Sequence, residues 1–245
     1  MISVCIPTYN GEKFIYQQII SILSQINSDD EIIISDDGST DKTLDIIKSF
    51  NDDRLKIFYN NKIKSKYSFN LTTQNLQNAL LKARGEIIFL ADQDDVWIDN
   101  KIERCINYLK NGYDLILHDC AIVDQNNNLI DKSYFKLNNS TPGIFNNIVK
   151  NSYLGCCMAI NKKVLNYALP FPKDIPHDIW IGLIAEEFTK VKFLQEILIN
   201  YRRHGNNLSA SGEKSSNTLL FKIKYRAIIL REFINRSLQL KIHNR

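Results

Sequence analysis

The chain has 245 residues, 44% of them hydrophobic and 24% charged, with a formal net charge of +4. This is enough for one large globular domain with a real core, and it excludes a disordered chain. No apolar stretch of 18 or more residues occurs and no signal-like segment opens the chain, so we expect neither a membrane-spanning nor a secreted protein. Five cysteines without a Cys-x-x-Cys spacing favour neither disulfides nor a zinc site, and a cytoplasmic location is expected.

Hydrophobic periodicity predicts alternating strands and helices through the first half of the chain. The expected strands are residues 2–6, 31–35, 55–58 and 86–91, and the expected helices are 12–26, 40–50, 70–83 and 98–109. Ser39 or Thr40 is expected to cap the second helix, and Gly85 suits the end of the third. This alternation predicts an α/β fold with a mostly parallel sheet flanked by helices.

After residue 112 the pattern loosens, with strand-like runs at 113–117, 120–123 and 191–199. We expect residues 1–112 to form the half that binds the first ligand. Residues 113–210 are expected to form a smaller antiparallel extension with the second ligand's pocket, and residues 211–245 a basic helical tail.

Two acidic clusters follow apolar runs, at the points where buried strands are expected to stop. They are Asp36-Asp37 and Asp92-Gln93-Asp94-Asp95. Ligands of such sheets bind beyond the carboxyl ends of the strands, and adjacent carboxylates repel one another unless a cation is shared. The clusters therefore indicate a divalent metal with a phosphate-rich ligand. Glycine-rich phosphate loops are absent from the sequence, which argues against a Rossmann dehydrogenase or a P-loop ATPase.

Four motifs occur in order and carry a family resemblance. They are Ile6-Pro7-Thr8-Tyr9-Asn10-Gly11, Asp36-Asp37-Gly38-Ser39-Thr40-Asp41, Ala83-Arg84-Gly85-Glu86 and the second acidic cluster. Over roughly residues 2 to 205 the chain resembles the family 2 glycosyltransferases, which have the GT-A fold. The resemblance implies a nucleotide-sugar donor, a glycan acceptor and a Mg²⁺ or Mn²⁺ ion bridging the donor diphosphate.

The same resemblance implies roles for individual residues. Pro7, Tyr9 and Asp37 would hold the nucleotide base and ribose, with Glu12 nearby. Asp92 would approach the ribose or a metal-bound water. Asp94, together with Asp95, would bind the metal.

The second half of the chain adds further site residues on the same basis. Asp178, in Pro176-His177-Asp178-Ile179-Trp180, would be the general base, although an ordinary helix cap is the alternative. Tyr201-Arg202-Arg203-His204 resembles a segment of rhamnosyltransferase-like bacterial members. There Arg202 would contact phosphate and His204 would bind metal or phosphate. Trp97 and Trp180 either stack on sugar rings or belong to the core.

The tail predicts an amphipathic helix, with apolar residues at 220, 223, 227, 230, 234 and 238 and a local charge of +6 over residues 217–245. One interpretation is a packed helix with a solvated basic face. The other is an interfacial helix that contacts anionic lipid at the inner face of the cell membrane. Nucleic-acid binding is not expected, because no reading motif accompanies the basic residues.

Together these features predict an inverting, metal-dependent glycosyltransferase of surface-glycan assembly. Its donor would be dTDP-rhamnose or a UDP-hexose, and its acceptor a hydroxyl of a growing glycan, with or without a lipid carrier. The alternatives are a catalytically silent nucleotide-sugar-binding module and a sugar nucleotidyltransferase. The silent module would lack the base or the metal acids, and the nucleotidyltransferase would need a glycine-rich loop that this chain does not have.

Overall fold

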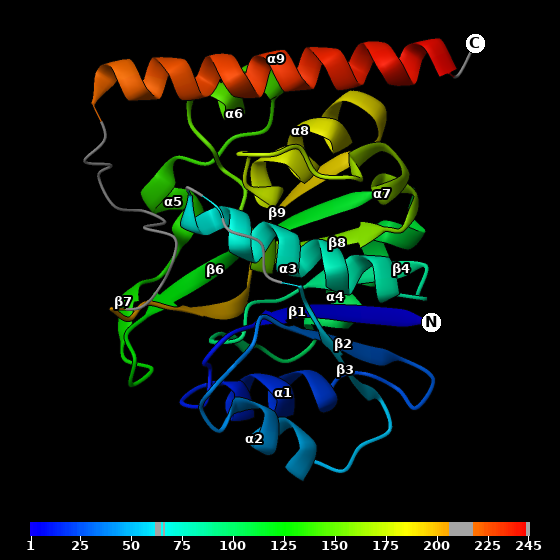
Figure 1. The fold of residues 1–245 in the computed structure, drawn as a ribbon, viewed down its shortest axis with the longest axis vertical. Coiled ribbons are helices and arrows are strands. Elements are labelled where there is room, and N and C mark those ends of the chain that lie inside the picture. Colours follow the sequence, from blue (N-terminus) through cyan, green and yellow to red (C-terminus); the bar gives the residue numbers. More distant parts are fainter. Residues whose placement is uncertain (62–64, 66, 206–217, 244–245) are drawn as a thin grey trace.

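The computed structural model describes residues 1–61, 65, 67–205 and 218–243. The fold is α/β, and its mixed sheet has the strand order β3-β2-β1-β4-β8-β6-β9-β5, with β7 beside β6 (Figure 1). The strands are β1 Ile2–Thr8, β2 Glu31–Asp36, β3 Leu55–Tyr59, β4 Ile87–Leu90, β5 Val96–Trp97, β6 Leu115–Val123, β7 Leu129–Asp131, β8 Met158–Asn161 and β9 Val191–Arg202. The helices are α1 Ile15–Leu23, α2 Thr43–Ser49, α3 Ser68–Lys82, α4 Lys101–Lys110, α5 Tyr134–Asn138, α6 Ile144–Val149, α7 Lys163–Ala168, α8 His177–Phe188 and α9 Leu219–His243, with the short 3₁₀ turn η1 at Gly155–Cys157.

The first half of the chain forms the predicted parallel sheet. β1 lies between β2 and β4 and runs parallel to both, and β3 extends the sheet beyond β2. Every residue of β1 and β2 is buried, as expected for strands covered on both faces. The strands therefore end at one edge, where Thr8 is paired with Asp36 and β4 leads directly into the second acidic cluster.

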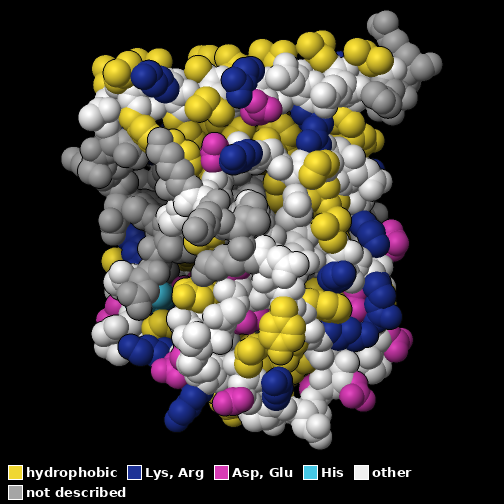
Figure 2. Space-filling model, in the orientation of Figure 1, with side chains coloured by type: hydrophobic (Ala, Val, Ile, Leu, Met, Phe, Trp, Pro, Cys, Tyr) yellow, Lys and Arg dark blue, Asp and Glu magenta, His cyan; other side chains and the backbone are white. Residues whose placement is uncertain are grey.

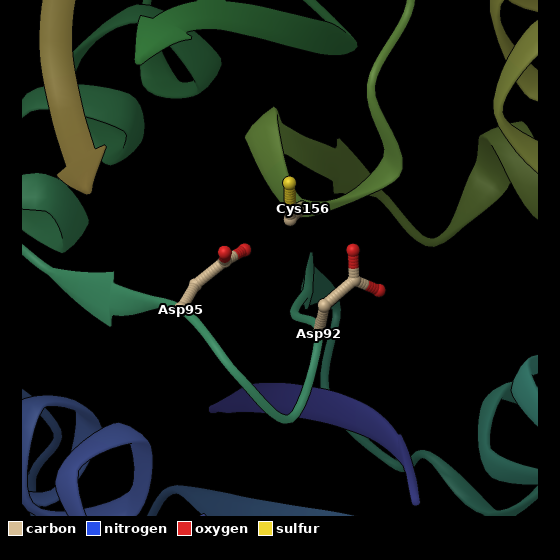
Figure 3. Close-up of side chains that lie close together, drawn as sticks. All are labelled: Asp92, Asp95 and Cys156. Atoms are coloured by element: carbon tan, nitrogen blue, oxygen red, sulfur yellow. The ribbon is translucent and has the colours of Figure 1, made fainter. Parts of the chain in front are cut away.

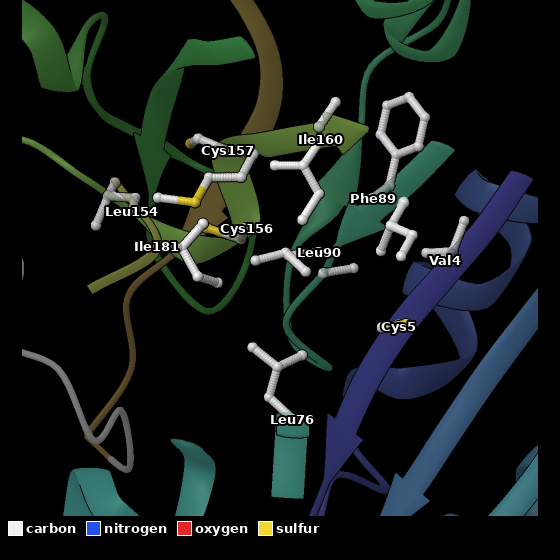
Figure 4. Close-up of a cluster of buried hydrophobic side chains, with 14 of the residues drawn as sticks. Val4, Cys5, Leu76, Phe89, Leu90, Leu154, Cys156, Cys157, Ile160 and Ile181 are labelled. Carbon is white, nitrogen blue, oxygen red and sulfur yellow. The ribbon is translucent and has the colours of Figure 1, made fainter. Parts of the chain in front are cut away.

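The second half joins this sheet through antiparallel pairs. β8 pairs antiparallel with both β4 and β6, and β9 runs parallel to β6 while pairing antiparallel with β5. This order places the end of β9 beside the acidic loop, where the Arg202 amide donates a hydrogen bond to Asp95 Oδ1 at 3.0 Å. Side chains of β1, β4 and β8 meet in the core together with those of η1 (Figure 4). All five cysteines are buried and free, which agrees with the absence of a disulfide framework.

Two local predictions about helix ends are wrong. Helix α2 begins at Thr43 without a side-chain cap, and the Ser39 hydroxyl instead donates to Asp36 at 2.5 Å. Helix α3 ends at Lys82, before Gly85. Gly85 serves a close approach of two chain segments, because a Cβ there would lie 2.6 Å from the Ser3 backbone nitrogen.

Helix α9 lies along one edge of the molecule and packs on α6 and α8 (Figure 1). Its packed face contains Ile229, Phe233 and Ser237, which are at most 8% exposed. The apolar stripe predicted from the sequence faces solvent instead, and Figure 2 shows hydrophobic side chains along this edge. No described helix is long and apolar enough to span a membrane. The expected boundary between residues 210 and 211 lies outside the described residues.

Candidate active site

The second acidic cluster occupies the loop between β4 and β5, at the carboxyl edge of the sheet. Carboxylate oxygens of Asp92 and Asp95 and the sulfur of Cys156 lie within 4.8 Å of one another (Figure 3). Cys156 belongs to η1, so this group joins the two halves of the sheet. The side chains converge because β4 and β8 are neighbours, although Cys156 follows Asp95 by 61 positions in the sequence.

Two carboxyl groups of this cluster, those of Asp92 and Asp95, resist ionisation. Burial and the nearby charges of Asp94 and Asp178 raise the pKa of Asp92 to about 7. Burial and the charges of Asp94 and Asp92 raise the pKa of Asp95 well above its usual range. A divalent cation would replace the protons held by such a cluster, because it supplies the missing positive charge.

The donor set suits a hard cation. Asp95 Oδ2 is buried and has no hydrogen-bond partner among the described residues, and the other carboxylates of the cluster add further oxygen ligands. The thiol of Cys156 is a poor ligand for Mg²⁺ or Mn²⁺. Its hydrogen bond to Cys157 and its burial raise its pKa well above the usual range, so it stays protonated.

Asp94 and His204 contact each other at this edge, but neither belongs to the Asp92–Asp95–Cys156 group. Nε2 of His204 lies 2.8 Å from Asp94 Oδ2. The imidazole stacks on Phe14 with 4.7 Å between ring centroids, and the Arg202 guanidinium carbon also lies 4.7 Å from the Phe14 centroid. Arg202 additionally donates to the carbonyl of Gln125 at 3.2 Å. Phe14 thus positions both side chains beside the acidic loop.

A buried lysine under the cluster was missed by sequence reasoning. The Lys101 ammonium donates to the Cys156 carbonyl at 2.9 Å and lies 4.1 Å from the centre of a Trp97 ring. Burial lowers its pKa, while the charge of Asp95 opposes that shift. Lys101 also lowers the pKa of Asp92, so it partly offsets the negative charge of the site.

The predicted nucleotide-binding residues lie at the ends of β1 and β2. Pro7 is buried in β1, Tyr9 is 46% exposed just beyond it, and Asp37 accepts a hydrogen bond from the Asn60 amide at 3.0 Å. Glu12 accepts from the backbone N–H of Lys42 at 3.0 Å, which fixes the start of α2.

Two members of the acidic motifs to which the sequence assigned no individual role, Asp36 and Gln93, organise these loops. Asp36 accepts from the backbone N–H groups of Gly38 and Ser39 at 2.9 and 2.8 Å. The Gln93 amide both accepts from and donates to the Tyr9 backbone, at 2.9 and 3.1 Å, and so ties the first loop to the acidic loop.

Asp178, the predicted base, is the second residue of α8. Pro176 occupies the cap position, so the ordinary helix-cap alternative does not hold. Asp178 Oδ1 accepts from the Ile179 N–H at 2.7 Å, and Oδ2 accepts from the Asn151 amide at 3.2 Å. Burial raises its pKa to about 6. Because its charge raises the pKa of Asp92, the carboxylates of α8 and of the acidic loop act on each other across the site.

The two tryptophans belong to the core. Trp97 is 4% exposed and Trp180 is 1% exposed, and the Trp180 indole donates to the Ala168 carbonyl at 2.8 Å. Their predicted alternative, stacking on sugar rings, is therefore wrong.

The family model for glycosyl transferase family 2 matches residues 3–168, about two thirds of the chain. This chain belongs to that family. Among curated relatives, the Escherichia coli UDP-Glc:alpha-D-GlcNAc-diphosphoundecaprenol beta-1,3-glucosyltransferase WfgD is 28% identical over 215 residues, covering 86% of this chain and 80% of the relative. The Campylobacter jejuni GalNAc(5)-diNAcBac-PP-undecaprenol beta-1,3-glucosyltransferase is 31% identical over 128 residues, covering 51% and 40%.

Solved structures agree on the fold. The chain superposes on Staphylococcus aureus TarS in complex with UDP-GlcNAc with a TM-score of 0.66 and 22% identity, covering 97% of this chain and 72% of TarS. The mannosyltransferase PcManGT of Pyrobaculum calidifontis, in complex with GDP-Man and Mn²⁺, gives a TM-score of 0.60 and 17% identity, covering 84% and 58%. The prediction of a GT-A fold is confirmed.

In this family 2 glycosyltransferase the predicted site residues fall into two groups. Those that come together at the acidic edge are Asp92, Asp94, Asp95, Arg202 and His204, with Asp178 acting electrostatically on Asp92. Pro7, Tyr9, Glu12 and Asp37 lie on the adjoining loops of β1 and β2, linked to the acidic loop through Gln93. Their individual roles toward a ligand remain predictions.

Proposed function

We propose that this glycosyltransferase moves a hexose from a uridine diphosphate donor to a hydroxyl of a lipid-linked glycan, with inversion at the anomeric carbon. The observation that carries the proposal is the pairing of two acidic centres. Asp94 of the Asp92–Asp95 loop contacts His204, and the half-buried Asp178 of α8 interacts electrostatically with Asp92. UDP-sugars are preferred over dTDP-rhamnose because WfgD is named for UDP-Glc and TarS is solved with UDP-GlcNAc.

One set of site residues would act on the leaving group, and another would act on the nucleophile. Asp94, Asp95 and His204 would hold Mg²⁺ or Mn²⁺, which stabilises negative charge on a departing nucleoside diphosphate. Arg202, held at its amide by Asp95, adds a positive charge next to the same position. Asp178 would remove the proton from the acceptor hydroxyl as it attacks, and with a pKa of about 6 it is largely ionised at neutral pH.

A titration of UDP into the protein, with and without Mn²⁺, tests the donor half of the proposal. We expect Mn²⁺ to tighten UDP binding and raise the melting temperature, since a ligand that binds only the native state stabilises it. Turnover of UDP-glucose, UDP-N-acetylglucosamine and dTDP-rhamnose is then compared by release of nucleoside diphosphate. A protein that binds no nucleotide would refute the proposal, and preference for dTDP-rhamnose would overturn the choice of donor.

The lipid-linked acceptor has support from the relatives and from α9. WfgD and the Campylobacter jejuni relative are both named for undecaprenol-linked substrates. On this chain, the outward side of α9 carries an aliphatic stripe about 33 Å long. Its members are Leu220, Ile223, Leu230, Ile234, Leu238 and Ile242, from 44% to 69% exposed. We propose that this stripe rests on an anionic bilayer.

The spacing of the stripe favours a flat surface over a partner helix. A heptad pattern through Leu230 and Ile234 would continue at Ser237 and Lys241, but Ser237 is buried and Lys241 forms an ion pair with Glu187. The stripe continues at Leu238 and Ile242, which keeps it on one side of a straight helix. Exposed Lys224 flanks it, and a basic residue contributes about 1 kcal/mol near anionic lipid. Arg231 also lies beside the stripe, but it is paired with Glu232 at 2.6 Å.

Co-sedimentation with vesicles tests the membrane contact. The double variant Leu230→Asp/Ile234→Asp should lose binding to anionic vesicles, and binding of the parent protein should weaken at high salt. The matched control is Leu129→Asp/Ile130→Asp, because these residues of β7 are 55% and 54% exposed but lie on another element. Equal sedimentation of the parent and the α9 variant would refute the contact.

A further inference from the structure

A groove lies beside the predicted base, between α3, α6, α8 and α9. We call it the aromatic groove, because Tyr67, Phe69, Phe221 and Tyr225 are among its lining residues. The four rings form a continuous series. Tyr67 stacks on Phe69 with centroids 5.2 Å apart, Phe69 meets Tyr225 edge-on at 6.5 Å, and Tyr225 stacks on Phe221 at 6.1 Å.

One part of the aromatic groove borders Asp178, which is not itself a lining residue. Two lining residues, Asn151 and Ile179, each donate a hydrogen bond to the Asp178 carboxylate, at 3.2 and 2.7 Å. The charge of Asp178 also reaches Tyr225, where it adds to burial in raising the pKa of the phenol. A molecule in the groove would therefore present one end to the group that must remove a proton.

The charge of the groove lining indicates which kind of ligand the groove would bind. Among the lining residues that the structure describes, the charged ones are Lys222 and Arg226, both basic, and none is a carboxylate. Arg226 is oriented by two hydrogen bonds to the Val149 carbonyl, at 3.1 and 2.7 Å. Aromatic faces suit the apolar faces of sugar rings and hydrocarbon chains, and paired basic side chains suit phosphate. Phe221, Lys222, Tyr225 and Arg226 also belong to α9, the helix that carries the aliphatic stripe.

We infer that the aromatic groove is the acceptor site, and that it holds a glycan attached through a phosphate or diphosphate to a lipid. The reacting sugar lies at the Asp178 end, the phosphate is bound by Lys222 and Arg226, and the aromatic rings contact sugar and hydrocarbon. This inference rests on the proposed function, because it takes Asp178 as the base. It adds where the acceptor lies and which groups of the acceptor are recognised.

Isothermal titration with a synthetic probe tests the site directly. The probe is N-acetylglucosaminyl diphosphate with an undecyl chain, and it is compared with the sugar diphosphate lacking the chain and with undecyl N-acetylglucosaminide lacking phosphate. We expect the complete probe to bind at least about tenfold more tightly than either fragment, since both groups are contacted. Absence of binding by the parent protein would overturn the inference.

Variants then assign the contacts. Tyr225→Ala should weaken binding of the complete probe about fivefold, whereas Tyr225→Phe, which keeps the ring, should stay within about twofold. Lys222→Gln/Arg226→Gln should weaken the complete probe and leave the phosphate-free glycoside unchanged. Tyr16→Ala is the matched control, because Tyr16 also belongs to an aromatic stack, with Phe50 at 5.2 Å, but lies outside the groove.

UDP binding is measured in every variant and separates the two claims. If UDP binds normally and the affinity for the probe is unchanged in the Tyr225 and Lys222/Arg226 variants, the groove assignment is wrong while the donor site stands. If the probe binds as expected but UDP does not bind, the acceptor site stands and the proposed transfer fails.

Discussion

Replacing the predicted base should make the protein more stable while removing its activity. Asp178 has a pKa of about 6 in the folded chain because of burial, against an ordinary value of 3.8. A carboxyl group whose pKa is raised by folding favours the native state at low pH, and this advantage is lost as pH rises from 3.8 through about 6. The corresponding cost at pH 8 is about 3 kcal/mol, an upper value because the side chain is only half-buried.

Asp178→Asn removes that cost and introduces a smaller one. The new amide still accepts from the Ile179 N–H, but its NH₂ group would face the Asn151 amide, which now donates to Asp178 Oδ2 at 3.2 Å. Losing this hydrogen bond costs about 1 kcal/mol. The expected net gain is therefore about 1–2 kcal/mol at pH 8, or a rise of about 2–8 °C in melting temperature. Below pH 4 the charge cost is absent and only the lost hydrogen bond remains, so the variant should be about 1 kcal/mol less stable than the parent.

Two measurements check this reasoning together. Urea unfolding of parent and variant at pH 4, 6 and 8 gives the pH dependence of stability, and transfer assays give turnover. Turnover should fall by about 10² or more with donor affinity within a few-fold, and the parent's rate should rise with pH through about 6. A stability difference that is independent of pH would refute the electrostatic argument. Donor binding that collapses together with the rate would make Asp178 a structural residue.

Three further substitutions test other parts of the site and fold. Asp94→Asn should leave the fold intact but abolish transfer and the Mn²⁺-dependent gain in UDP affinity, whereas Asp99→Asn, at an exposed position, should keep both. Full activity of Asp94→Asn in excess chelator would exclude a metal mechanism. Phe14→Ala should weaken UDP·Mn²⁺ binding about tenfold, because His204 and Arg202 both lie on its ring, and Phe50→Ala is the control from another aromatic stack. A UDP·Mn²⁺ affinity of Phe14→Ala within about twofold of the parent would contradict a positioning role for Phe14. Gly85→Ala should lower the free energy of unfolding, measured by urea denaturation, by about 1–3 kcal/mol, since the new Cβ would lie 2.6 Å from the Ser3 nitrogen. Gly205→Ala is the control, because a Cβ there meets open space. Equal stability of the two variants would disprove the steric argument.

The parallel half of the fold and its acidic edge could be predicted because their signals are local. A strand buried on both faces is a continuous apolar run, and the carboxylates that follow it necessarily reach the ligand-binding edge. The strand expected at 31–35 is observed at Glu31–Asp36, and the strand expected at 2–6 extends to Thr8. Helix starts were less predictable, because Ser39 uses its hydroxyl for Asp36 and leaves α2 without a side-chain cap.

The orientation of α9 could not be derived from periodicity, because apolar residues occur on both of its sides. Ile229 and Phe233 pack inward while Leu230 and Ile234 face out. Basic residues divide in the same way. Arg236 donates to the carbonyls of Tyr167, Leu169 and Pro170, so it anchors the helix to the body of the protein and does not contribute to a solvated basic face.

Residues that position others are the part of the site hidden from sequence reasoning. Asp94 and His204 could be proposed as a pair because each has ligand chemistry, whereas Phe14, which orients His204, looks like any other aromatic residue before a helix. Lys101 was hidden for a related reason, since a lysine that opens a helix is ordinarily exposed, and only the fold places its ammonium under the Cys156 carbonyl. The chemistry of this site therefore depends on two groups of residues. The first group is the acids that a motif can reveal, and the second is the apolar and basic side chains that fix where those acids lie. Changes to the second group should alter affinity and pH response without removing any predicted ligand.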